Sequence, residues 1–64
     1  MLLGKIKVWN QGDGWGFIES DNGEDYFLNV KNLRLGQHIK VGVRVKFDTE
    51  ESQRGPQAIN VSLY

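Results

Sequence analysis

The sequence predicts an all-β domain in which five short strands close into a small barrel. Its eight glycines fall between short apolar and aromatic runs, a spacing typical of strands separated by turns. Asn22 and Gly23 form the strongest short-range hairpin signal. Residues 41–48 alternate between apolar and polar side chains, as a half-buried strand does. A chain of 64 residues suffices for one domain, so we expect residues 1–64 to form a single unit.

The first three strands are predicted in the N-terminal half. Residues 3–9 are rich in strand-forming side chains and end in the turn-like segment 10–14. Residues 15–19 form the second strand. The Asn-Gly pair tolerates the positive φ of a type I′ turn, so residues 25–30 should run antiparallel to the second strand. A single helical turn is expected at 30–33, at the start of an irregular segment.

The last two strands are predicted at 41–48 and 56–63, with a polar turn at 50–55 and Pro56 at the start of the fifth strand. Left open, five strands would expose two edges and one uncovered apolar face, so we favour a barrel. The apolar side chains expected inside it are Ile6, Ile18, Leu28, Val43, Val45, Phe47, Ile59 and Val61.

Three rings are predicted to gather outside this core. Alternation places Trp15 and Phe17 on one face of the second strand, and Phe27 and Asn29 on one face of the third. If the turn sets the register, the three rings form one contiguous patch. The inward positions are already filled, and further rings would overpack them. Exposed apolar patches mark binding sites, and flat rings suit nucleobases, which all offer a π-face.

Several segments, in this order along the chain, resemble the bacterial cold-shock proteins: Gly4-Lys5-Ile6-Lys7, Asn10, Gly14-Trp15-Gly16-Phe17-Ile18, Asp25-Tyr26-Phe27-Leu28, Arg54-Gly55-Pro56-Gln57-Ala58 and Asn60-Val61. The resemblance implies a five-stranded antiparallel Greek-key barrel of the OB-fold type. It further implies that the chain binds single-stranded RNA or DNA, with an RNA chaperone or a regulator of gene expression as the expected roles.

Carried over residue by residue, the family's stacking positions fall on Trp15, Phe17 and Phe27. The resemblance places polar and charged support on Lys7, Asp25 and Arg54. The chain also departs from the family pattern. Asp13 replaces a phosphate-seeking lysine, and the stacking positions at Val8, Asn29 and Val30 lack rings. Asn29 retains the ability to hydrogen-bond a base edge.

Two further aromatic side chains are candidate contacts with nucleic acid. Strict alternation places Trp9 with Lys5 and Lys7 on the outer face, whereas the family register makes position 8 the outer one. A bulge in the first strand would decide between a ligand-facing and a partly buried Trp9. His38, in the irregular segment, is either a stacking contact or a solvated loop residue.

The charge balance limits the expected affinity. Eight basic and eight acidic side chains leave no formal net charge, which is unusual for a nucleic-acid-binding domain. We therefore expect weak to moderate binding driven by stacking, with a preference for flexible pyrimidine-rich strands. The alternative is a degenerate OB-fold module whose aromatic face binds a protein partner. Oligosaccharide binding on that face is a minor possibility.

The sequence offers no basis for catalysis. The single histidine has no cysteine or evident serine partner, so we expect no enzymatic activity, no cofactor and no metal site. No apolar run approaches the roughly 20 residues of a membrane span, and the start lacks a signal-peptide pattern. We expect a cytoplasmic protein. A monomer is the default expectation, with weak dimerisation left open.

Overall fold

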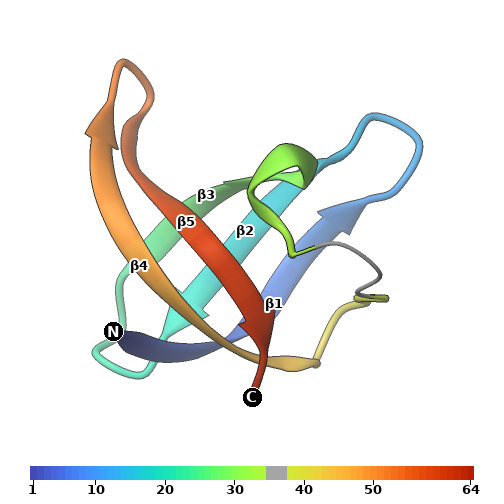
Figure 1. Ribbon diagram of the computed structural model, residues 1–64, viewed down its shortest axis with the longest axis horizontal. Coiled ribbons are helices and arrows are strands. Elements are labelled where there is room, and N and C mark those ends of the chain that lie inside the picture. Colours follow the sequence, from blue (N-terminus) through green and yellow to red (C-terminus); the bar gives the residue numbers. More distant parts are fainter. Residues whose placement is uncertain (35–37) are drawn as a thin grey trace.

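The computed structural model describes residues 1–34 and 38–64, and these form one closed barrel with strand order β1-β2-β3-β5-β4 (Figure 1). Neighbouring strands run antiparallel, except that β3 meets β5 in parallel and so closes the barrel. The predicted all-β barrel is confirmed. Its elements are β1 (Leu2–Asn10), β2 (Trp15–Ser20), β3 (Asp25–Asn29), the 3-10 helical turn η1 (Val30–Asn32), β4 (Arg44–Ser52) and β5 (Gly55–Leu63).

The first three strands and η1 lie where the sequence predicts them, but the fourth strand does not. It was expected at 41–48 and followed by a turn at 50–55, whereas β4 runs from Arg44 to Ser52. Glu50 to Ser52 pair with the start of β5, so the turn there is much tighter. The prediction was wrong because this end of β4 is largely exposed and shows no apolar alternation.

The β2–β3 turn also differs from the predicted type. Gly23 has a φ of 91°, but Asn22 does not have a positive φ, so the turn is not type I′. The Gly23 amide donates to the Ser20 carbonyl at 2.9 Å, and the Ser20 amide donates to the Glu24 carbonyl at 2.8 Å. The turn still brings Glu19 opposite Asp25, which sets the register of the whole hairpin.

The core is close to the predicted one, with two exchanges. Val43 and Ile59 are only half-buried, and Tyr26 and Ala58 are buried in addition. A register shift in the β4–β5 pairing and a positive φ of 54° at Asn60 break the alternation of β5. Ala58 and Val61 therefore both point inward. The buried cluster consists of Ile6, Ile18, Tyr26, Leu28, Val45, Phe47, Ala58 and Val61.

A bulge in β1 decides the position of Trp9. Ile6 pairs with Ile18, but Val8 pairs with Phe17, so Lys7 is the extra residue. The bulge leaves Val8 exposed beside Phe17 and turns Trp9 towards Gly16, where its half-buried ring packs against the core. Of the two alternatives for Trp9, partial burial is the one observed.

The backbone of β1 passes close to Gly16 of β2, and we predict that this position tolerates no side chain. A Cβ there would collide with the Val8 carbonyl oxygen and lie 2.8 Å from the Trp9 ring. Gly16→Ala should lower the free energy of unfolding by about 1–3 kcal/mol, the usual cost of overpacking. Urea denaturation measures this loss. In the matched control Gly12→Ala the new Cβ meets only the Asn10 side chain at 3.7 Å, and a comparable loss there would contradict the prediction.

An ion pair between Asp21 and Arg44 connects the β2–β3 turn to β4. Arg44 donates two hydrogen bonds to the Asp21 carboxylate, each 3.0 Å long. These bonds hold the pKa of the Asp21 carboxyl below its ordinary value of 3.8. A lowered folded-state pKa means that the pair stabilises the fold above the unfolded-state pKa, and that this contribution is lost as the pH falls through the folded-state pKa.

We therefore predict that Asp21→Asn destabilises the protein near neutral pH, and that wild type and variant converge as the pH falls below the ordinary value of 3.8 and through the lowered pKa of the folded Asp21 carboxyl. Thermal midpoints measured across this range test the prediction. Glu50→Gln, which removes another exposed carboxylate, is the control. A gap between wild type and Asp21→Asn that stays constant with pH would show that the ion pair is not the cause.

Candidate nucleic-acid interface

Three rings from two neighbouring strands form a contiguous group on the outside of the barrel. Phe17 of β2 lies directly opposite Phe27 of β3, and Trp15 precedes Phe17 on the same face. The Trp15 and Phe17 rings are 6.2 Å apart at 84°, and the Phe17 and Phe27 rings are 5.8 Å apart at 76°. Both pairs have the favourable edge-to-face geometry. The predicted contiguity is confirmed, and Trp15, Phe17 and Phe27 are called the aromatic platform below.

The platform is not equally open along its length. Trp15 and Phe17 are half-buried, but Phe27 is only 9% exposed although it lies outside the core cluster. Arg54 covers it, with the guanidinium carbon 5.0 Å from the ring centroid, a cation–π distance. The expectation that all three rings are exposed is therefore wrong for Phe27, because the β4–β5 turn brings Arg54 over that ring.

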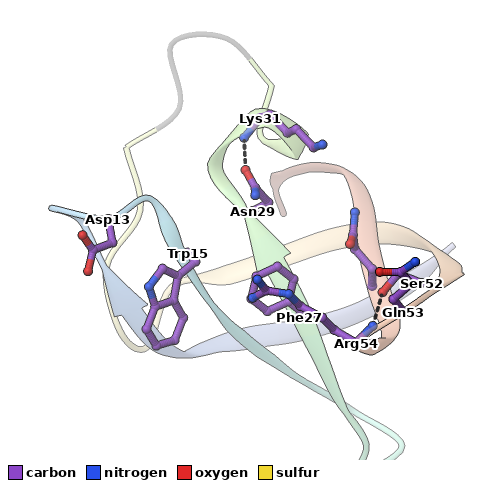
Figure 2. Close-up of a pocket in the computed structure, with 9 residues that line it drawn as sticks. Asp13, Trp15, Phe27, Asn29, Lys31, Ser52, Gln53 and Arg54 are labelled. Carbon is purple, nitrogen blue, oxygen red and sulfur yellow. Dashed lines mark hydrogen bonds between the residues drawn. The ribbon is translucent and has the colours of Figure 1, made fainter.

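The β4–β5 turn holds Arg54 in place. The Ser52 hydroxyl accepts a hydrogen bond from the Arg54 amide at 3.2 Å and donates one to the Gly55 carbonyl at 2.7 Å. Gly55 has a φ of 105°, which a residue with a side chain rarely adopts. Two long strands thus extend their turn to the platform, as the Arg54 side chain in Figure 2 shows.

A cleft of about 450 Å³ lies beside the platform. A second hollow of about 270 Å³ is lined by the three platform rings and Arg54. The larger cleft is walled by rings on one side and by the β4–β5 turn on the other, with Asn29 and Lys31 at one end (Figure 2). Its lining residues are Asp13, Trp15, Phe27, Asn29, Lys31, Ser52, Gln53, Arg54 and Gln57.

Lys7 and Asp25, both predicted at the site, are bonded to each other. The Lys7 ammonium donates to the Asp25 carboxylate at 2.9 Å across β2. This hydrogen bond, reinforced by the charge of the carboxylate, raises the pKa of Lys7. Lys7 is therefore a charged group that already has an anionic partner, and a phosphate has to compete for it.

Asp13 introduces a negative charge at the edge of the cleft. Its carboxylate accepts a hydrogen bond from the Asn10 amide nitrogen at 3.0 Å, and its own backbone amide donates to the Asn10 side chain at 3.2 Å. Asp13 thus stabilises the β1–β2 loop. Lys31 and Arg54 are the cations that line this cleft.

Trp9 and His38 lie apart from the platform. Both line a separate hollow of about 190 Å³, together with Gln11, Val30, Leu33 and Ile39, and it shares no residue with the two clefts above. The exposed His38 and the half-buried Trp9 thus form a second region. That either side chain contacts nucleic acid stays a prediction.

Two glutamines of the cleft were not predicted from the sequence. Gln53 belongs to the β4–β5 turn, and Gln57 pairs with Phe27 across the parallel β3–β5 contact. This contact joins residues thirty positions apart, and no local sequence pattern predicts it. The Arg-Gly-Pro-Gln-Ala segment, which carries much of the resemblance, contains Gln57 and was the one indication in the sequence that this part of the chain belongs to the site.

The family model described as the "'Cold-shock' DNA-binding domain" matches residues 2–64. This chain belongs to the cold-shock domain family. It is 39% identical over 64 residues to the "Major cold shock protein" of Streptococcus pyogenes serotype M1, covering 97% of this chain and 96% of the relative. It is also 39% identical over 63 residues to "Cold shock-like protein CspB" of Bacillus cereus, covering 95% and 97%.

The fold comparison agrees with this assignment. The barrel superposes on "drosophila Unr CSD456" with a TM-score of 0.80 at 18% identity, over 98% of this chain and 26% of that larger chain. At this identity the likeness shows the fold alone, and the fold is the OB-type barrel. As a cold-shock domain, the chain is a member of a nucleic-acid-binding family.

Within 1–34 and 38–64, no three acidic, histidine or cysteine side chains are grouped so that they could hold a metal ion. In the same residues, no helix has the length and apolar character needed to cross a membrane.

Proposed function

We propose that the chain binds single-stranded RNA or DNA by stacking bases on the aromatic platform. The observation that carries this proposal is the outward-facing array of Trp15, Phe17 and Phe27 beside a cleft with two cations. Each stacked base contributes about 1–3 kcal/mol without reading sequence. Such binding suits an RNA chaperone or a regulator of gene expression, which acts on many strands.

Arg54 takes part in this proposed mode. A base that stacks on Phe27 has to displace the guanidinium from the ring, because Arg54 already covers it. The displaced guanidinium then pairs with the phosphate of the same strand or stacks on the outer face of the base. The free protein thus keeps Phe27 out of water until a base replaces the arginine.

The charges around the platform favour modest affinity. Lys7 is paired with Asp25, and Asp13 adds a negative charge at the cleft, where the resemblance expects a cation. Lys31 and Arg54 remain as the phosphate contacts of the larger cleft. Stacking therefore contributes most of the binding energy, and flexible pyrimidine-rich strands fit the platform best.

A protein partner is the second candidate. Val8 is 40% exposed and Val30 is 50% exposed, and both stand at positions where the resemblance expects stacking rings. Exposed aliphatic side chains beside aromatic ones suit a protein surface. The neutral net charge is compatible with this alternative as well.

We predict that Trp15→Ala weakens binding of short oligouridine by about 1–3 kcal/mol, roughly 5- to 150-fold, because one stacking surface is lost. Anisotropy of a labelled oligonucleotide measures the change. Tyr64→Ala is the control, since this exposed ring follows β5 and lines neither of the two clefts at the platform. Trp15→Phe, which keeps a ring, should retain most of the affinity. Unchanged binding by Trp15→Ala would reject stacking on Trp15, whereas failure of the wild-type protein to bind would favour the protein partner.

We also predict a shallow salt dependence. Each neutralised phosphate of a single strand adds about 0.7 to the slope of log K against log salt, so two contacts give a slope of about −1.4. Titrations between about 50 and 300 mM salt measure it, and Lys31→Gln should reduce the slope by about 0.7. A slope steeper than about −3 would mean that phosphate contacts dominate.

A further inference from the structure

Asn29 occupies the fourth position of the surface that carries the three rings. It lies directly opposite Trp15 in the β2–β3 pairing, just as Phe27 lies opposite Phe17. Its half-buried side chain lines the larger cleft together with Trp15, Phe27 and Lys31. A base that stacks on Trp15 or Phe27 therefore has an edge next to the Asn29 amide. The amide is therefore placed to hydrogen-bond the edge of the base, whereas the rings contact the π-face of the base.

The orientation of this amide is set by η1. Asn29 caps the helical turn, and its Oδ1 accepts a hydrogen bond from the Lys31 backbone amide at 3.0 Å. Only the oxygen can accept from an N–H, so this bond distinguishes the two ends of the amide. Figure 2 shows the oxygen directed at Lys31. Among residues 1–34 and 38–64, no protein acceptor bonds the Nδ2 group, which remains available in the cleft.

The two cations that line the cleft with Asn29 also favour an acceptor. Lys31 and Arg54 carry only donors, and both line the cleft with Asn29. Asp13 is the acidic residue of the lining, and its carboxylate is hydrogen-bonded to Asn10 in the β1–β2 loop.

Ser52, Gln53 and Gln57 can both donate and accept, but they belong to β4, the β4–β5 turn and β5. A base edge that enters beside Asn29 lies next to the N–H donors of Asn29 and Lys31. A carbonyl oxygen satisfies them, whereas an exocyclic amino group places a donor against donors and leaves both unpaired.

We propose that Asn29 is a specificity-determining residue, which donates a hydrogen bond from Nδ2 to a keto oxygen of the stacked base. The inference rests on the proposed function and names its preferred ligand: bases with a keto group at that edge, such as uracil, over bases with an amino group there, such as cytosine. Asparagine reads adenine by using its oxygen and nitrogen together. Here Oδ1 is directed at the Lys31 backbone amide, which leaves Nδ2 as the group available to the base.

Uracil and cytosine provide the sharpest test, because they have the same ring size and differ at the exocyclic keto or amino group. Oligouridine and oligocytidine of equal length are titrated at about pH 8, where cytosine is neutral, and the ratio of their Kd values is compared. The wild-type protein should bind oligouridine about 3- to 10-fold more tightly than oligocytidine. This factor corresponds to one neutral hydrogen bond made with uracil and not made with cytosine.

Two substitutions keep a side-chain oxygen that can cap η1 and change the group that residue 29 presents to the base edge. Serine and aspartate both cap helical turns well, so Asn29→Ser and Asn29→Asp should keep thermal midpoints close to that of wild type. Asn29→Ser removes the Nδ2 group and leaves a shorter side chain whose single oxygen caps η1, so the hydrogen bond to the base edge is lost and the Kd ratio should fall to about one. Asn29→Asp replaces the donors with an acceptor and should favour oligocytidine, because a carboxylate accepts from the cytosine amino group. Its added charge weakens both ligands alike and cancels in the ratio.

The outcomes separate the two proposals. If wild type binds neither oligonucleotide, the proposed function fails. If wild type binds both equally, or if Asn29→Ser keeps the preference for oligouridine, single-strand binding stands and the assignment of specificity to Asn29 is overturned. A preference that disappears in Asn29→Ser and reverses in Asn29→Asp supports it.

Discussion

The register of the β2–β3 hairpin is the constraint on which the candidate site depends. Side chains alternate between the two faces of a strand, so a slip by one residue would bury the rings and expose Ile18 and Leu28. The hydrogen bonds of the turn at Ser20 to Glu24 prevent that slip. The same register places Asn29 beside Trp15. One short turn therefore aligns the stacking rings and the amide that we propose to read the base edge.

Two local irregularities adapt the barrel to this hairpin. The bulge at Lys7 lets β1 follow β2 past Gly16 while Val8 stays outside and Trp9 packs inward. The β4–β5 turn reaches over Phe27 and covers the ring with a cation. Both features limit how much aromatic surface meets water. A small domain thus carries three outward rings without leaving them all exposed.

The electrostatics of the site differ from those of a strongly basic nucleic-acid-binding surface. Near the platform, Lys7 is bonded to Asp25 and a carboxylate lines the cleft, so long-range attraction of phosphate is weak. Recognition then depends on short-range contacts, namely ring faces, the Arg54 guanidinium and oriented amides. Such contacts distinguish bases better than charge does, because phosphates are the same along every strand.

Local pattern in the sequence determined the strand content, most of the core and the outward face of Trp15, Phe17 and Phe27. Alternation and turn residues act over a few positions, so they can be read from a single chain. The resemblance to cold-shock proteins supplied Lys7, Asp25 and Arg54, which no local pattern predicts.

Only the tertiary structure decided what these residues touch. Arg54 over Phe27, Gln57 beside β3, Trp9 turned inward and Ala58 in place of Ile59 all follow from long-range pairing or from bulges. A bulge reverses alternation beyond it and leaves little trace in residue type. The orientation of the Asn29 amide likewise depends on η1 and on the partner of its oxygen. The sequence thus determined which side chains lie outside, and the closed barrel decided which of them meet.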